Sequence, residues 1–193
     1  MPIRAPVLHH LNLYHYWLSK CRGRGMAARA DINPGEIPVL LPYLSLVDRI
    51  DGKFHYRLVG SAVAEQFGHD LTGSLATSHV SSIPETIAAA QALGERVFAN
   101  PQPIFVTGQF QTKSGEPHNA SALILPLLDR GTNVNMAIFT RVAAFSSGVW
   151  ASRDWLKDAP LKLADAVDIH DAVDLERCCF EWYRSCLAIS TAA

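Results

Sequence analysis

Histidine and cysteine are the side chains here most able to bind metals or act as nucleophiles, but both are scattered along the sequence. Three of the eight histidines, His9, His10 and His15, lie near the start of the chain. None of these pairs has the i, i+4 spacing that places two ligands on one helix face. Three of the four cysteines lie within residues 178–186, without the Cys-x-x-Cys spacing of a zinc or redox site. We therefore expect no metal site.

Motifs for covalent or phosphate chemistry are also missing from the sequence. There is no Gly-x-Ser-x-Gly turn and no phosphate-binding loop, and the cluster Gly23-Arg24-Gly25 follows a predicted helix rather than a strand. The pairs His69-Asp70 and His170-Asp171 resemble acid/base pairs, but adjacent residues seldom converge on one substrate. We expect no catalytic residue and no enzymatic activity.

The elements that must position any site alternate between strand and helix patterns. Residues 44–50 and 54–60 are predicted strands on either side of Asp51-Gly52, a strong hairpin signal. After a helical stretch, three more strands follow at residues 104–112, 119–127 and 134–145. This order predicts an α+β fold with a five-stranded antiparallel sheet and its helices on one face.

Helices are predicted on both sides of this core as well as inside it. The first covers about residues 8–18, two further helices cover 61–67 and about 82–99, and the pattern after residue 150 is helical again. The last helix carries an apolar stripe, which we expect to be an interface that packs on its own sheet or on a twin chain. The stripe consists of Leu175, Cys179, Trp182, Cys186 and Ile189.

Composition indicates one globular domain with flanking segments. The chain has 193 residues, of which 49% are hydrophobic and 18% charged. We expect an N-terminal helix and proline-rich connector at 1–43, a core at 44–145, and a C-terminal helical extension at 146–193.

The charge and the N-terminus bear on partners and on location. A formal net charge of −1 gives no case for nucleic acid or a membrane as a partner. The first twenty residues lack the apolar core of an export signal, and the cysteines lack paired spacing. We therefore expect a cytoplasmic protein.

Several short motifs occur in a characteristic order. They are Arg29-Ala30-Asp31-Ile32, then Leu41-Pro42, Tyr56-Arg57-Leu58-Val59-Gly60-Ser61, and Phe67-Gly68-His69-Asp70-Leu71-Thr72-Gly73. Together with the strand order, they resemble a family of small, often stand-alone bacterial PAS-like domains. The resemblance implies a PAS fold and a sensory role, but it names no ligand.

Two departures concern the cofactors of other PAS domains. Flavin-binding photosensors of this superfamily carry a cysteine in a Gly-x-Asn-Cys-Arg motif, whereas residues 61–101 contain no cysteine. Haem-binding members commonly use a histidine on the long helix, whereas residues 83–99 contain none. Haem and flavin are unsupported, so we expect no cofactor other than an unidentified small ligand.

The PAS resemblance places a mostly apolar pocket between the inner sheet face and the helices. Arg57 would anchor a carboxylate if it pointed inward. The strand alternation places it opposite Tyr56, which favours an outward side chain paired with an acid such as Asp48. The same apolar residues would equally fill a closed core. The residues expected to line the pocket are Tyr56, Leu58, Phe67, Leu71, Phe105, Leu123 and Phe139.

Three functions are compatible with these observations. The first is a sensory module that binds a small molecule or a partner protein and signals through its flanking helices to a separate effector protein, with homodimerisation left open. The second is a ligand-free interaction or dimerisation scaffold. The third is a small isomerase-like enzyme, which would need an inward acid with a perturbed pKa. A cavity in the core would favour the first over the second.

Overall fold

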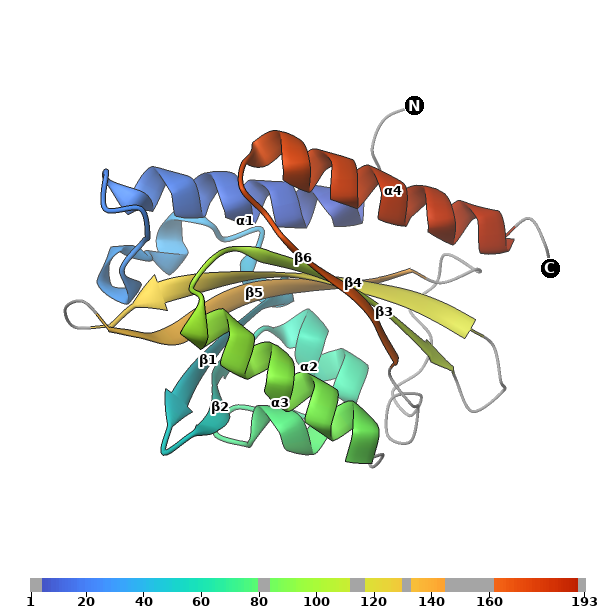
Figure 1. Cartoon of the computed structure of the whole chain (residues 1–193), viewed down its shortest axis with the longest axis horizontal. Coiled ribbons are helices and arrows are strands. Elements are labelled where there is room, and N and C mark those ends of the chain that lie inside the picture. Colours follow the sequence, from blue (N-terminus) through green and yellow to red (C-terminus); the bar gives the residue numbers. More distant parts are fainter. Residues whose placement is uncertain (1–4, 80–83, 112–116, 130–132, 145–161, 191–193) are drawn as a thin grey trace.

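The centre of the molecule is a six-stranded antiparallel sheet with the strand order β2-β1-β5-β4-β3-β6 (Figure 1). The computed structural model describes residues 5–79, 84–111, 117–129, 133–144 and 162–190. The strands are β1 (Leu44–Ile50), β2 (Lys53–Val59), β3 (Ile104–Gln111), β4 (Pro117–Leu128), β5 (Val134–Ala144) and β6 (Lys162–Asp168).

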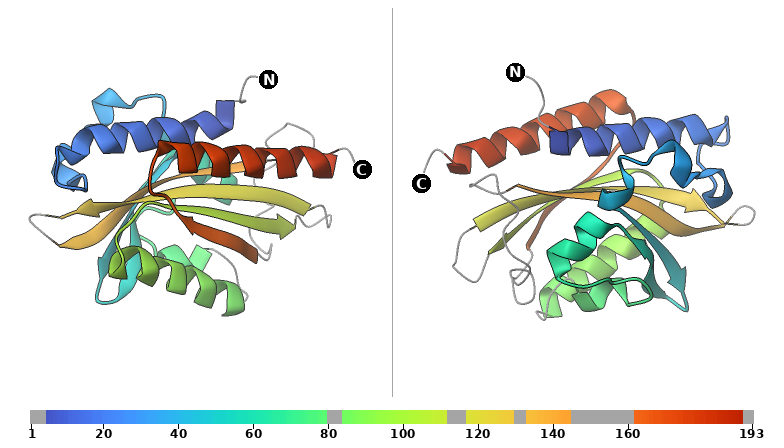
Figure 2. Two further views of the ribbon diagram at one scale, coloured as in Figure 1. Left: turned by 45° about the horizontal axis from the view of Figure 1, so that its top comes forward. Right: turned by 180° about the vertical axis from the view of Figure 1, so that it is seen from behind.

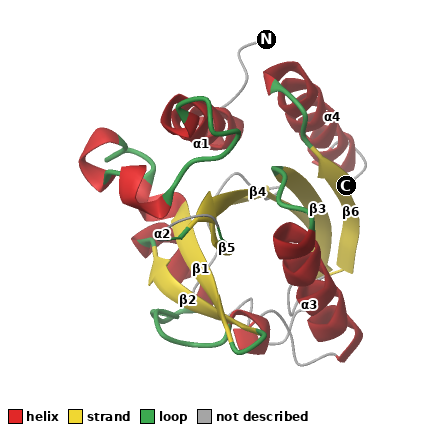
Figure 3. Cartoon of the chain, turned by 60° about the vertical axis from the view of Figure 1, so that its left-hand side comes forward, coloured by secondary structure: helices red, strands yellow, loops and turns green. Residues whose placement is uncertain are grey.

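Helices cover both faces of the sheet. Figure 2 shows α1 and α4 side by side on one face, which we call the outer face, and Figure 3 shows the sheet curving around α3 on the other, inner face. The helices are α1 (Ala5–Cys21), α2 (Ser61–Phe67), α3 (Pro84–Ala99) and α4 (Ala172–Ser190), with short 3-10 turns η1 (Arg29–Asp31), η2 (Pro34–Glu36), η3 (Leu41–Tyr43) and η4 (Ala76–His79). The helices of the central core share the inner face, and the two flanking helices cover the outer one.

The predicted fold class is confirmed, and the predicted strands agree with the structure. Each of the five begins and ends within two residues of its predicted bounds. The hairpin between β1 and β2 turns at Asp51 and Gly52, whose φ angles of 50° and 74° are those that such a tight turn requires.

The sixth strand corrects the prediction that the chain after residue 150 is helical only. β6 pairs with β3, with Ile104 opposite Asp168 and Phe105 opposite Val167. Its sequence, Lys-Leu-Ala-Asp-Ala-Val-Asp, is rich in alanine and aspartate, which are depleted in strands. The local sequence of β6 carries almost no strand signal. We infer that its pairing with the edge of β3 stabilises it as a strand.

The central strands are buried on both faces. In β4, Leu123, Leu125 and Leu127 are fully buried in the core formed with α1 and α4. Ile124, which alternates with them, lies on the inner face beside Val97 and Val106. A strand covered on both faces needs an almost continuous apolar run, and this explains the sequence Ser-Ala-Leu-Ile-Leu-Pro-Leu-Leu at residues 121–128.

Helix α1 is fixed to the outer face by polar contacts as well as by packing. The imidazole of His10 is fully buried, with Nδ1 2.6 Å from Thr140 Oγ1 and Nε2 3.0 Å from Ser121 Oγ. Further along the helix, the indole Nε1 of Trp17 donates to the Pro126 carbonyl at 2.9 Å. Burial, aided by the nearby His9, lowers the pKa of His10 to about 3. His10 is therefore a neutral link between α1, β4 and β5.

Gly60 allows the chain to pass closely between η3 and the start of α2. A Cβ atom at this position would overlap the backbone oxygens of Leu41 and Pro42. The Gly60 amide also donates to the Leu44 carbonyl at 2.7 Å. Only glycine fits, because the neighbouring atoms are backbone and cannot rotate away.

We predict that Gly60→Ala destabilises the protein by about 1–3 kcal/mol, because the added methyl group forces the backbone apart. Urea unfolding followed by circular dichroism measures this change. Gly35→Ala is the matched control, since the nearest atom to its Cβ would be Asn33 Oδ1 at 3.3 Å; it should alter stability by less than about 0.5 kcal/mol. Equal effects of the two substitutions would contradict the close-contact explanation.

The second prediction concerns the dependence of stability on pH. The folded pKa of His10, about 3, lies below its ordinary value of 6.5, so the unfolded chain takes up a proton that the folded protein excludes. This contribution is therefore present above pH 6.5 and is lost as the pH falls toward 3. At about pH 5 the loss should reach about 2 kcal/mol.

His10→Leu removes the imidazole and leaves the hydroxyls of Thr140 and Ser121 without this hydrogen-bond partner. The variant should be less stable by about 1–3 kcal/mol at neutral pH, but its stability should fall less steeply with acid than that of the wild type. His15→Leu, at an exposed position of the same helix, should leave the slope unchanged. Urea titrations at several pH values measure both slopes, and parallel wild-type and His10→Leu profiles would refute the assignment.

Candidate ligand-binding site

An apolar cavity in two adjacent parts lies between α3 and the inner face of the sheet. The first part has a volume of about 150 Å³ and the second about 160 Å³. Both are lined by Ala90 and Leu93 of α3, Ile124 of β4 and Phe139 of β5. The shared walls make the two parts one site, which extends from β2 to β3 across the sheet.

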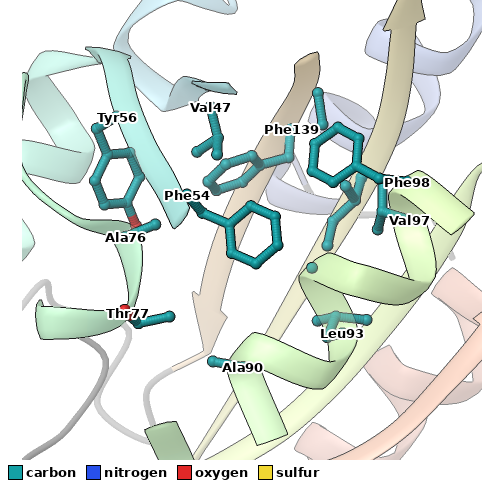
Figure 4. A pocket seen from close by; sticks show the side chains of 13 residues that line it. Val47, Phe54, Tyr56, Ala76, Thr77, Ala90, Leu93, Val97, Phe98 and Phe139 are labelled. Atoms are coloured by element: carbon teal, nitrogen blue, oxygen red, sulfur yellow. The ribbon is translucent and has the colours of Figure 1, made fainter. Parts of the chain in front are cut away.

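Aromatic rings form much of the first part (Figure 4). Phe54 of β2 stacks on Phe98 of α3, with ring centroids 5.6 Å apart, and Tyr56 lies 6.4 Å from Phe139. A Cβ at Gly94 would lie only 2.5 Å from Phe54 Cε2. The glycine thus lets the Phe54 ring lie directly against the helix.

A cationic side chain enters this apolar space. Arg141 of β5 lines the second part of the cavity, and its guanidinium carbon lies 5.0 Å from the centre of the Phe67 ring. Burial lowers the pKa of Arg141, and the nearby Tyr56 opposes that shift. Among the described residues, no carboxylate forms an ion pair with this guanidinium. A cation over an aromatic face is favourable, although that contact does not replace a counter-ion.

Tyr56 supplies a second polar group to the same space. The side chain is buried and lines the first part of the cavity. Burial raises the pKa of its phenol, which is therefore protonated at neutral pH. Within the described part of the chain the hydroxyl has no hydrogen-bond partner. The cavity therefore combines largely apolar walls with the cation of Arg141 and a phenol hydroxyl that has no partner among the described residues.

The predicted pocket residues divide between the two faces of the sheet. Tyr56 and Phe139 line the cavity, and Phe67 and Leu71 pack in the same cluster as Tyr56. Phe105 and Leu123, which pair with each other across β3 and β4, lie instead in the outer core with α1 and α4. Their placement in the pocket is corrected, because strand parity sets their side chains on the opposite face from Ile124.

A β-bulge moves another predicted residue away from the cavity. Leu46 pairs with Leu58 but Val47 pairs with Tyr56, so Arg57 is an extra residue in β2. Leu58 therefore shares a face with Leu46 rather than with Tyr56, and it is 40% exposed. Regular alternation predicted the reverse, and the bulge is the reason for the correction.

Arg57 does not enter the cavity. Its side chain is half exposed and forms an ion pair with Asp48, which matches the outward alternative. The inward cationic position considered for Arg57 is occupied by Arg141, which lines the second part of the cavity. The sequence could have indicated Arg141, because it lies two residues after Phe139 in β5 and therefore on the same face of the strand.

The apolar stripe of α4 faces its own sheet. Leu175, Cys179 and Trp182 are buried in the outer core, and Cys186 is partly buried beside it. The side chain of Ile189 lies outside the described residues. Of the two partners considered for the stripe, the structure places the chain's own sheet against it, so these side chains are not free to bind a second protein.

Among the described residues, no group of three or more histidine, cysteine or acidic side chains is arranged to hold a metal ion. No described helix is long and apolar enough to cross a membrane.

The architecture is that of an α+β domain, with an apolar cavity between an antiparallel sheet and α3. The chain belongs to the PAS domain family, whose model matches residues 7–138, more than half of its length. The expected resemblance is thereby confirmed. Among curated proteins, no sequence matches the chain.

The solved structures that match part of the chain include VqmA and a light-oxygen-voltage domain. VqmA bound to DPO shares 16% identity at a TM-score of 0.44, over 57% of this chain and 57% of that one. A light-oxygen-voltage domain with a flavin analogue shares 13% identity at a TM-score of 0.44, over 58% of this chain and 84% of that one. A Vibrio cholerae VqmA–ligand–DNA complex shares 16% identity at a TM-score of 0.43, over 60% and 55%. The match thus spans little more than half of each VqmA chain.

These structures correct one expectation about partners. The near-neutral net charge led us to exclude nucleic acid, but VqmA is described in a complex with DNA and as a LuxR-type receptor. A protein of similar fold is thus associated with DNA, and the exclusion of nucleic acid is wrong as stated.

Proposed function

We propose that this PAS domain is a non-catalytic sensor that binds a small molecule in the cavity under α3 and signals through α1 and α4 to an effector. The observation that carries the proposal is the cavity itself, with largely apolar walls and two polar groups, on Arg141 and Tyr56, that lack partners among the described residues. Small-molecule sites typically combine a largely apolar lining with a few polar anchors. A closed core of a pure scaffold would need neither the space nor the anchors.

The route from cavity to helices is short, because neighbouring residues of β5 face opposite sides of the sheet. Arg141 lines the cavity on the inner face. Thr140, the preceding residue, contacts His10 of α1 on the outer face. A ligand that moves this part of β5 would therefore change the contact that fixes α1, provided that it binds the two arrangements with different affinity.

The lining residues also bear on the alternatives. Among the described residues around the cavity there is no aspartate or glutamate, which disfavours the acid–base chemistry of an isomerase-like enzyme. No described cysteine or histidine lines it either, and all four cysteines lie on α1 and α4, across the sheet. The flavin-adduct and haem-ligand roles seen elsewhere in the superfamily therefore have no residue here, and we propose a ligand without either cofactor.

Filling the cavity tests the proposal. Ala90→Leu places a larger side chain between both parts of the cavity. Native mass spectrometry of protein purified from its own host should show a bound small molecule in the wild type and its loss in this variant, by about tenfold or more in occupancy. The control is Ala88→Leu, at an exposed position of the same helix, which should keep the molecule.

Stability measurements complete the test. Ala90→Leu should unfold within about 1 kcal/mol of the wild type, because the added atoms enter empty space. A wild-type protein that is reproducibly empty would refute the sensor and favour the ligand-free scaffold. A ligand retained equally by both variants would place the site elsewhere.

A further inference from the structure

The environment of Arg141 differs from that of the other arginines that the structure describes inside the fold. Arg96 pairs with Asp168 across α3 and β6 at 2.8 Å, and Arg57 pairs with Asp48. Arg141 contacts the face of Phe67 and lies near the neutral phenol of Tyr56, with no acid among its described neighbours. A desolvated charge without a counter-ion is costly to a folded protein. A bound anionic ligand would supply the missing counter-ion and offset this free-energy cost.

The space beside Arg141 limits the shape of that counter-ion. A dry cavity of about 150 Å³ lined by apolar side chains accommodates a benzene-sized molecule. Here, two adjacent parts of about 150 and 160 Å³ share walls, and the guanidinium lies at the second. The second part is lined by the small residues Gly108, Ala120 and Ala122 on the strands as well as by the larger walls that it shares with the first part. An elongated ligand fits better than a wide one.

The geometry points to a small aryl-alkyl carboxylate as the ligand of this domain, with its carboxylate paired to Arg141 and its ring in the first part of the cavity, against the side chains of Phe54 and Phe139. This inference rests on the proposed function and names its ligand class. A planar guanidinium binds a carboxylate through two parallel hydrogen bonds. The Tyr56 hydroxyl is protonated and has no partner among the described residues. It can therefore donate a further hydrogen bond to the same anion or to a water beside it. The pairing is strong because the surroundings are apolar.

The test compares matched acids and amides. Binding of 3-phenylpropionate and phenylacetate is measured by isothermal titration calorimetry and by thermal shift, beside 3-phenylpropionamide and phenylacetamide, which have the same shape without the charge. For the wild type we expect at least one acid to bind, and to bind about tenfold or more tightly than its amide. If no acid binds at millimolar concentration, or if acids and amides bind equally, the ligand class is wrong.

Substitution of the arginine gives the second arm. Arg141→Met should abolish the preference for acid over amide, whereas Arg57→Met, at the outward ion pair, should retain it. Arg141→Gln replaces the methionine variant if that variant does not fold. A preference for acids that survives both Arg141 substitutions would overturn the assignment.

The unliganded stability of the same variant is an independent readout. Because the guanidinium has no counter-ion among the described residues, Arg141→Met should unfold at the same temperature as the wild type or higher. A clearly lower unfolding temperature would assign Arg141 to structural support and contradict the inference. A neutral molecule found bound in the wild type and lost in Ala90→Leu would reject the carboxylate while leaving the sensor function intact.

Discussion

The structure depends on one constraint, that the strands β4 and β5 are buried on both of their faces. The outer face carries the main core, in which fully buried leucines of β4 meet α1 and α4. The inner face carries smaller clusters around α2 and α3, and these leave a cavity. Each face thus has its own core clusters, and the apolar cavity under α3 lies on the inner one.

Two groups of polar side chains, one on each face, differ in their partners. On the outer face, the His10 imidazole satisfies two buried hydroxyls, those of Ser121 and Thr140, and it remains neutral because burial depresses its pKa. On the inner face, the Arg141 guanidinium and the Tyr56 hydroxyl have no such partners among the described residues. The satisfied network fixes the position of a helix, whereas the unsatisfied pair is available to a ligand. Thr140 and Arg141 are neighbours in β5, so the contact with His10 on the outer face and the cavity on the inner face are one residue apart in the same strand.

This arrangement accounts for a sensor that keeps the common PAS layout without the residues that bind flavin covalently or ligate haem in other members. The cysteines belong to the flanking helices, where two of them are buried as small apolar groups and the other two are partly buried beside the core. Burial raises the pKa of Cys179 to about 12, so this thiol is protonated and inert at neutral pH. In the function that we propose, recognition depends on the shape and charge of the cavity.

Local signals in the sequence determined the elements of this protein. The Asp51-Gly52 turn, the glycine that ends α2 and the apolar runs of β1, β3, β4 and β5 predicted the core sheet within two residues at each end. The family resemblance supplied the order of the layers. What the sequence could not show was the face on which each strand residue lies, because the bulge at Arg57 reverses Leu58 and the pairing with β4 turns Phe105 outward. Strand β6 exists only through its pairing with β3. The surroundings of Arg141 are likewise a property of the tertiary structure, because the segments that pack around it decide that none of its described neighbours is an acid.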